Sequence, residues 1–419
     1  MRILIAIDKF KGSLTSLAAA HAIKRGIEAA AVGTAPLDAI AENIFDIVEI
    51  ADGGDGSADV LLKVNEGVEI VPVFGVNPLG QEIESSYLSY YEPDILKSDA
   101  GICSLRKCAF IEMAKISGLE LVPQQDPRGC KLRNPLFTTT YGLGQLMRKA
   151  YENGARKITL SIGGSATNDG GTGMLQALGF KFYDKDGVLI TDYMCGGLLS
   201  RIGRVEAPAE GLFADSLNRA SGKSHCACDI EVICDVTNPL LGETGATYVY
   251  GPQKGADYQM LQQLESGMEN LVEVSCDVIA SSDSGESVHL LPGAGAAGGV
   301  GFAVKAFLNG KIISGWRFFA NLTGLEEKIK QADIVISGEG KIDDQSFCGK
   351  VVDGVLTLAH KYGKRCILFC GVNALPEGIS IPKVPILQIS DIEPDKEKSM
   401  SNAALLLEAL AYKSVISYG

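Results

Sequence analysis

Short apolar runs alternate along the chain with segments whose apolar residues recur at helical spacing. Residues 2–7 form a continuous run rich in β-branched residues, which predicts a buried strand. Residues 15–30 carry apolar side chains three and four positions apart, which predicts a helix. A second strand is expected at residues 45–50, directly before a glycine-rich turn. Strand, turn and helix in this order are the unit from which parallel sheets are built.

The same order of elements recurs in the middle and in the last third of the chain. We expect strands at residues 157–162, 230–234, 332–337, 365–370 and 384–389, and helices at residues 174–178, 351–362 and 402–412. This alternation predicts an α/β protein. A chain of 419 residues corresponds to two domains at roughly 100–200 residues per domain.

Composition removes several classes of function. With 46% hydrophobic and 21% charged residues, the chain is not a disordered protein. Its 38 basic and 51 acidic residues give a net charge of −13, which argues against a nucleic-acid partner. The chain has neither a membrane-spanning apolar run nor a signal-peptide pattern, and its 11 cysteines are scattered as in reduced proteins. We therefore expect a cytoplasmic protein without a membrane partner, and its oligomeric state stays open.

Glycine is abundant, with 49 residues, and much of it is concentrated in six segments. Backbone N–H groups at the carboxyl ends of parallel strands form anion sites, and glycine permits the close approach of a ligand. Five segments also carry a carboxylate, a lysine or a hydroxyl, which favours an anion site. The six segments are residues 8–13 (DKFKGS), 52–56 (DGGDG), 163–171 (GGSATNDGG), 251–255 (GPQKG), 293–299 (GAGAAGG) and 338–344 (GEGKIDD).

Other catalytic signatures are weaker. The P-loop pattern is absent, and residues 293–299 match G-x-G-x-x-G without the acidic residue that a dinucleotide site needs about 20 positions later. We expect these small residues to let a helix start close to another backbone. No G-x-S-x-G elbow is present, and His225, Cys226 and Cys228 lack a second pair of zinc ligands. Loops with many Asp, Lys and Gly residues and few His residues suit phosphoryl transfer.

Eight sequence blocks resemble those of type I glycerate kinases, the bacterial-type glycerate 2-kinase family. In chain order they are IAIDKFKGSLTS, ADGGDGSADVL, EMAKISGLELVP, RNPLFTTTYGLG, SIGGSATNDGGTGMLQALG, CDVTNPLLGETGATYVYGPQKGA, LPGAGAAGG and ADIVISGEGKIDDQS. They occur in family order and cover nearly the whole chain. Residues 86–108 and 207–228 are longer than the family minimum and carry no family motif.

This resemblance implies a reaction and a domain arrangement. The implied reaction is the ATP-dependent phosphorylation of D-glycerate with Mg²⁺, at the 2-position according to the family name. The implied fold is a Rossmann-like domain of residues 1–75 and 290–419, with an inserted α/β domain of residues 76–289 and the site in the cleft between them. A nicotinamide-dependent dehydrogenase of a hydroxy acid and a non-catalytic glycerate sensor are the alternatives.

Candidate catalytic residues follow from the need to remove a proton from the accepting hydroxyl. We expect Asp169 to be the general base because glycines surround it, and Asp8, at the end of the first strand, is the second choice. Asp169 as the cap of the following helix is an equally supported interpretation. Lys11, beside Gly12 and Ser13, suits a phosphate or the substrate carboxylate.

Further candidates would bind the anionic groups and Mg²⁺. Arg133 could pair with the glycerate carboxylate through two hydrogen bonds. The other substrate or phosphate candidates are Gly163, Gly164, Ser165, Lys254, Gly293, Gly295 and Lys341. Mg²⁺ requires one or two carboxylates, and the candidate ligands are Asp52, Asp235, Glu339 and Asp343.

Overall fold

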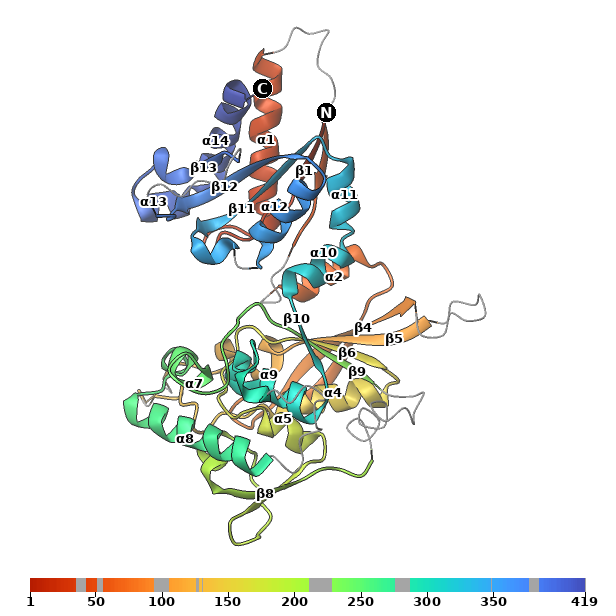
Figure 1. The fold of residues 1–419 in the computed structure, drawn as a ribbon, viewed down its shortest axis with the longest axis vertical. Coiled ribbons are helices and arrows are strands. Elements are labelled where there is room, and N and C mark those ends of the chain that lie inside the picture. Colours follow the sequence, from red (N-terminus) through yellow and green to blue (C-terminus); the bar gives the residue numbers. More distant parts are fainter. Residues whose placement is uncertain are drawn as a thin grey trace. The chain divides into compact units, whose positions relative to one another are not determined.

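The chain folds into two compact units, which are described separately (Figure 1). The computed structural model describes residues 1–34, 43–50, 56–93, 105–125, 128–129, 131–210, 228–275, 287–347, 349–376 and 384–418. The first unit comprises Met1–Asp52 and Ser314–Gly419, and the second comprises Gly53–Ile313. This arrangement confirms the expected α/β class.

The units differ in their limits from the domains expected from the sequence. The expected insertion began at residue 76 and ended at residue 289. Strand β3 (Glu69–Val76) and strand β10 (Lys311–Ile313) nevertheless pair with the sheet of the second unit, through strands β4 (Glu82–Pro93) and β9 (Asp229–Ile233) respectively. Hydrogen bonding therefore extends the second unit in both directions along the chain.

A five-stranded parallel sheet forms the centre of the first unit. Its strand order is β13-β12-β11-β1-β2. The strands are β1 (Arg2–Ile5), β2 (Ile44–Ile47), β11 (Ile334–Ile342), β12 (Arg365–Asn373) and β13 (Ile386–Gln388). Counted in chain order, this sheet has the arrangement 2-1-3-4-5, and the connections leave in opposite directions at β1 and β11. Such a switch point is where doubly wound α/β proteins bind ligands.

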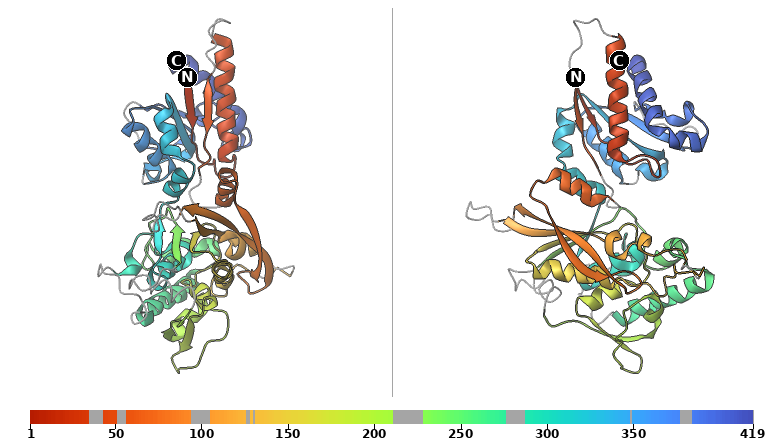
Figure 2. Two further views of the ribbon diagram at one scale, coloured as in Figure 1. Left: turned by 90° about the vertical axis from the view of Figure 1, so that its right-hand side faces the viewer. Right: turned by 180° about the vertical axis from the view of Figure 1, so that it is seen from behind.

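Helices cover both faces of this sheet (Figure 2). Helices α1 (Ser16–Thr34) and α14 (Ala403–Tyr418) lie together on one face, and α11 (Leu325–Gln331) and α12 (Val351–Lys361) lie on the other. Because side chains alternate along a strand, Ile3 and Ile5 pack toward α1 and α14, and Leu4 is buried on the opposite side. This burial of both faces explains the continuous apolar run at the start of the chain.

Strand β11 is longer than the sequence analysis expected, and this corrects one element. The expected strand ends at residue 337, before the glycine-rich segment 338–344, but β11 pairs with β12 as far as Ile342 opposite Asn373. Gly338 has a φ of 152°, and a Cβ there would lie 1.8 Å from the Phe369 carbonyl oxygen. Glycine at this position therefore lets the strand pass close to β12, whereas sequence reading treats glycine as a strand end.

The second unit contains a six-stranded mixed sheet of order β10-β9-β6-β5-β4-β3. Strands β5 (Leu105–Glu112), β6 (Lys157–Ser161), β9 and β10 run parallel, and β3, β4 and β5 form an antiparallel meander. The meander includes the described parts of residues 86–108, one of the two longer segments. A separate antiparallel pair joins β7 (Lys181–Asp184) to β8 (Ile202–Glu206), just before the second longer segment.

Helices of the second unit pack on this sheet and enclose one large apolar core. The longer ones are α2 (Ser57–Val64), α4 (Tyr141–Glu152), α8 (Tyr258–Ser275) and α9 (Ala296–Phe307), and the shorter ones are α3 (Ala114–Ser117), α5 (Thr172–Ala177) and α7 (Ala246–Tyr250). Short 3₁₀ turns occur at η2 (Leu119–Leu121) and η4 (Pro252–Lys254). Among the helices that the structure describes, none has the length and apolar character needed to cross a bilayer.

Candidate functional site

A cavity of about 760 Å³ opens at the switch point of the first unit. Its walls come from residues that follow β1, from the carboxyl halves of β11 and β12, and from the segment before α14. Five residues singled out in the sequence line it, namely Asp8, Lys11, Ser13, Glu339 and Lys341. The DKFKGS and GEGKIDD motifs, which are more than 300 residues apart in the chain, therefore contribute to one hollow.

The loop after β1 is held by short-range hydrogen bonds and by one contact to helix α13 (Lys396–Ser401). The Phe10 N–H donates to the Leu14 carbonyl over 2.9 Å, and the Ser13 N–H donates to the Phe10 carbonyl over 2.8 Å. The Ser13 hydroxyl donates to the Met400 carbonyl over 2.6 Å. Gly12 has a φ of 77°, so the left-handed turn there requires glycine. These hydrogen bonds hold the loop in one conformation as part of the cavity wall.

Lysine is the commonest charged residue of this cavity. Five lysines line it, at positions 9, 11, 341, 350 and 396, against three carboxylates, at positions 8, 339 and 393. Lys341 pairs with Asp343 over 2.9 Å. Within the described part of the chain, Lys11, Lys350 and Lys396 form no ion pair. In a chain with a net charge of −13, this local excess of cations suits an anionic ligand.

Asp169 belongs to the second unit and is completely buried. One of its oxygens accepts hydrogen bonds from the Thr140 N–H over 2.8 Å, the Thr140 hydroxyl over 2.7 Å and the Gly173 N–H over 3.3 Å. The other accepts from the Gly171 N–H over 3.1 Å. Burial raises the pKa of the Asp169 carboxyl, and these hydrogen bonds act in the opposite direction. The carboxylate thus joins the starts of helices α4 and α5, although the residue at the N-cap position of α5 is Gly171 and not Asp169.

Lys254 is also buried in the second unit, within the GPQKG motif. Its ammonium group donates to the Thr167 carbonyl over 2.6 Å and so holds the loop that contains Asp169. Burial lowers the pKa of Lys254 to about 7, and the negative charge of Asp169 acts in the opposite direction. Its observed contact is therefore with the protein backbone, and its expected role at a phosphate stays a prediction.

The GAGAAGG segment packs against the same loop. A Cβ on Gly298 would lie 2.1 Å from the Thr167 carbonyl oxygen, and one on Gly295 would lie 2.1 Å from the Pro239 carbonyl oxygen. The Gly170 N–H donates to the Gly298 carbonyl over 2.9 Å. This confirms that the small residues let a helix start close to another backbone. Gly293, at the start of the segment, has a φ of 86°.

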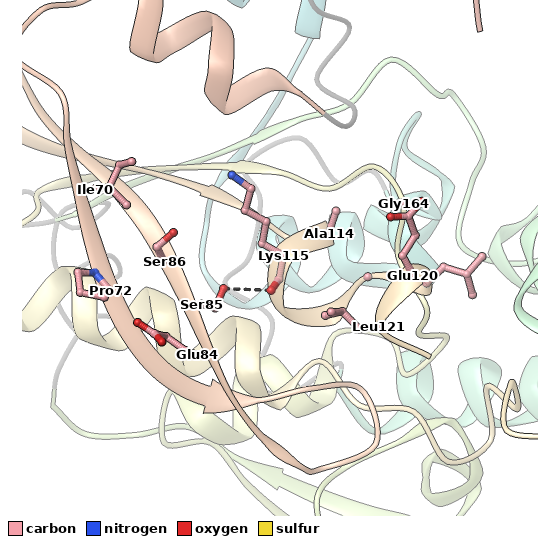
Figure 3. A pocket seen from close by; sticks show the side chains of 12 residues that line it. Ile70, Pro72, Glu84, Ser85, Ser86, Ala114, Lys115, Glu120, Leu121 and Gly164 are labelled. Carbon is pink, nitrogen blue, oxygen red and sulfur yellow. Dashed lines mark hydrogen bonds between the residues drawn. The ribbon is translucent and has the colours of Figure 1, made fainter. Parts of the chain in front are cut away.

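A second cavity, of about 770 Å³, lies in the second unit between strands β3 and β4 and residues 114–121 (Figure 3). Gly164 lines it, and the neighbouring Ser165 pairs with Gly118 in an isolated bridge. Lys115 contributes the cavity's lysine and pairs with Glu112 over 2.9 Å. Lys115 is not among the residues singled out in the sequence, although it lies in the EMAKISGLELVP block.

Arg133 stabilises the wall of this second cavity. Its Nε donates to the Val122 carbonyl over 3.0 Å, and its Nη2 donates to the Leu119 carbonyl over 3.4 Å. Leu119 itself lines the cavity. Both of these contacts of the guanidinium group go to backbone carbonyls, and the expected pairing of Arg133 with a substrate carboxylate stays a prediction.

The four expected Mg²⁺ ligands are distributed over both units. Glu339 lines the first-unit cavity, and Asp343 forms an ion pair with Lys341, which lines the same cavity. Asp235 follows β9 in the second unit, and Asp52, with most of the DGGDG motif, lies outside the described residues. Among the described residues, no three His, Cys, Asp or Glu side chains gather as a metal cluster.

Comparisons with known proteins agree in one family. The model of the "Glycerate kinase family" matches residues 3–417. A glycerate kinase of Halalkalibacterium halodurans is 38% identical over 88% of this chain and 85% of its own length. A glycerate 2-kinase of Escherichia coli is 38% identical with the same coverage of both chains. A crystal structure from Salmonella typhimurium, assigned as a glycerate kinase 2, superposes with a TM-score of 0.70 at 34% identity, covering 100% of this chain and 98% of that one.

Proposed function

Because this chain belongs to the glycerate kinase family, we propose that it transfers the γ-phosphoryl group of ATP to a hydroxyl of D-glycerate. The observation that carries the proposal is the family match, which extends over residues 3–417 and therefore over both units. The lysine-lined cavity of the first unit supports it, because phosphoryl transfer relies on positioning and on neutralising negative charge.

Proton removal from the accepting hydroxyl is assigned to a carboxylate that can reach the substrate. Asp8 is only partly buried and lines the first-unit cavity, and its Oδ1 accepts the Lys9 N–H over 2.7 Å. Asp169 is fully buried, with both oxygens engaged. A general base must come within hydrogen-bond reach of the proton that it takes. We therefore favour Asp8 over Asp169 for this role.

The proposed step balances as follows. Asp8 accepts the hydroxyl proton, the hydroxyl oxygen forms a bond to the γ-phosphorus, and the bond from that phosphorus to the β–γ bridging oxygen breaks to release ADP. Lys11 and Lys341 would neutralise the phosphoryl oxygens as charge redistributes. Glu339 fits a role in holding Mg²⁺, since it faces the same cavity and Mg²⁺ takes one or two carboxylates beside phosphate oxygens. When bound, Mg²⁺ would shield the negative charge of the triphosphate.

Coupled measurement of ADP release tests the proposal. We expect ADP release in the presence of ATP, Mg²⁺ and D-glycerate, and much less with L-glycerate or without an acceptor. Phosphorus NMR of the product then identifies the hydroxyl, and we expect 2-phosphoglycerate, in line with the name of the E. coli relative. Absence of acceptor-dependent ADP release from folded protein would overturn the proposal. A 3-phosphoglycerate product would change only the position assigned to the transfer.

A further inference from the structure

We propose that the first-unit cavity binds the nucleotide, with the cavity's lysines around the phosphates and its apolar side chains around the nucleobase. This inference rests on the proposed function and adds to it the unit that holds ATP. It begins from topology, because the cavity lies at the 2-1-3-4-5 switch point between β1 and β11. Crevices at such points are the usual ligand sites of doubly wound sheets.

Close backbone packing brings the two lysine-bearing motifs together. A Cβ on Gly340 would lie 3.3 Å from the Phe10 Cα and 3.4 Å from the Lys11 nitrogen. The strand that carries Lys341 therefore runs directly beside the loop that carries Lys11. Glycine at position 340 keeps this approach open, since any larger residue would meet the Phe10–Lys11 backbone. The two cations consequently belong to adjoining parts of one wall.

Charge distinguishes the two cavities. The first-unit cavity has five lysines and three carboxylates among its lining residues. The second-unit cavity has one lysine, Lys115, and two carboxylates, Glu84 and Glu120. A nucleoside triphosphate carries several negative charges, whereas glycerate carries a single carboxylate. The excess of cations in the first unit therefore fits the more highly charged of the two substrates.

Apolar side chains in the same cavity suit a purine ring. Val372, near the carboxyl end of β12, is 40% exposed, and Met400 in α13 is 37% exposed. Phe10 and Ile389 lie beneath this surface and are buried. Partly exposed Val and Met side chains in a cavity otherwise rich in charge provide a surface on which a base can lie. The volume of about 760 Å³ lies in the range of about 300–1,000 Å³ that is typical of small-molecule sites.

Titration calorimetry with ADP, without glycerate, tests the lysines. We expect Lys11→Met and Lys341→Met each to raise the Kd for ADP tenfold or more, and to raise the KM for ATP while the KM for glycerate changes less than twofold. Lys24→Met is the matched control, because it removes the same charge from α1 of the same unit and Lys24 pairs only weakly with Glu28 at 3.6 Å. It should leave ADP binding unchanged. Thermal unfolding checks that each variant is folded.

Comparing ADP with inorganic tripolyphosphate tests the apolar surface. Val372→Ser should weaken ADP binding by about threefold to tenfold and leave tripolyphosphate binding unchanged, because the latter has no base. If Val372→Ser weakens the binding of ADP and of tripolyphosphate equally, or weakens neither, the assignment of the nucleobase to this surface is wrong. Unchanged ADP affinity in both lysine variants would overturn the nucleotide site as a whole.

The outcomes separate this inference from the proposed function. If the protein phosphorylates glycerate but the lysine variants raise only the KM for glycerate, the proposed function stands and the cavity holds glycerate. If ADP binds with the expected dependence on Lys11 and Lys341 but no acceptor-dependent turnover occurs, the nucleotide site stands and the proposed function fails.

Discussion

The DKFKGS segment of the first unit and the GGSATNDGG segment of the second unit follow parallel strands and combine glycine with carboxylate and hydroxyl groups. Their polar side chains nevertheless have different surroundings. Asp8 and Lys11 face a cavity, whereas Asp169 is sealed in the protein and accepts four hydrogen bonds. Similar local sequence therefore forms a cavity wall in one unit and a buried hydrogen-bonded network in the other. Solvent access to the carboxylate is what separates the two.

Substituting the two aspartates gives the sharpest test of this comparison. Asp8→Asn should lower kcat by about 10²–10⁴-fold with little change in melting temperature, because it removes the proposed base at a position that is only partly buried. Steady-state kinetics and thermal unfolding measure the two effects. Asp333→Asn, in an exposed position at the amino end of β11, is the control and should keep full activity. A near-normal kcat for Asp8→Asn would remove Asp8 from the mechanism.

Asp169→Asn should act on stability. An amide cannot accept all four hydrogen bonds, so at least one buried N–H loses its partner, and we expect a loss of about 1–3 kcal/mol in the free energy of unfolding. Chemical denaturation measures it. The control is Asp395→Asn, which changes an exposed cap of α13 that accepts the Lys398 N–H over 3.0 Å. There Asn should cap equally well. If Asp169→Asn has normal stability but no turnover, Asp169 and not Asp8 is the general base.

Lys254 allows a test, with a smaller expected effect that depends on pH, of the buried hydrogen bonds around the loop that contains Thr167 and Asp169. Its folded pKa of about 7 lies below its ordinary value of 10.5. Between these values the unfolded chain binds more protons, so Lys254 makes stability increase as pH rises. Lys254→Met should reduce this slope by about 1 kcal/mol per pH unit between pH 7 and 9.

Denaturation of both proteins at pH 7, 8 and 9 measures that difference. Several thiols have pKa values that desolvation raises, including those of the partly buried Cys195 and Cys234, each raised to about 11. Raised thiol pKa values make stability decrease as pH rises, which is opposite to the effect of Lys254. The same thiols are present in wild type and in Lys254→Met, so their contribution cancels when the two slopes are compared. Lys24→Met should keep the wild-type slope. Parallel slopes for wild type and Lys254→Met would show that the Lys254 ammonium is not held at a lowered pKa.

Much of the framework was readable from the sequence. The apolar run at residues 2–7 and the alternation of strands and helices predicted an α/β fold because local periodicity reports which face of an element is buried. The small residues of 293–299 predicted a close backbone approach, which the packing of Gly295 and Gly298 confirms. These features depend on side-chain size and spacing within one segment, and that information is contained in the local sequence.

Tertiary structure alone decided the surroundings of the charged residues. The expected strand ended at residue 337, before Gly338 and Gly340, yet pairing with β12 extends β11 and places Lys341 at the cavity. The local sequence of Lys254 does not show that its side chain is buried and donates to the Thr167 carbonyl. Burial, strand register and the pairing of distant motifs arise from contacts between segments far apart in the chain. A lysine or an aspartate beside glycine has the same local sequence whether those contacts leave it open to a ligand or enclose it.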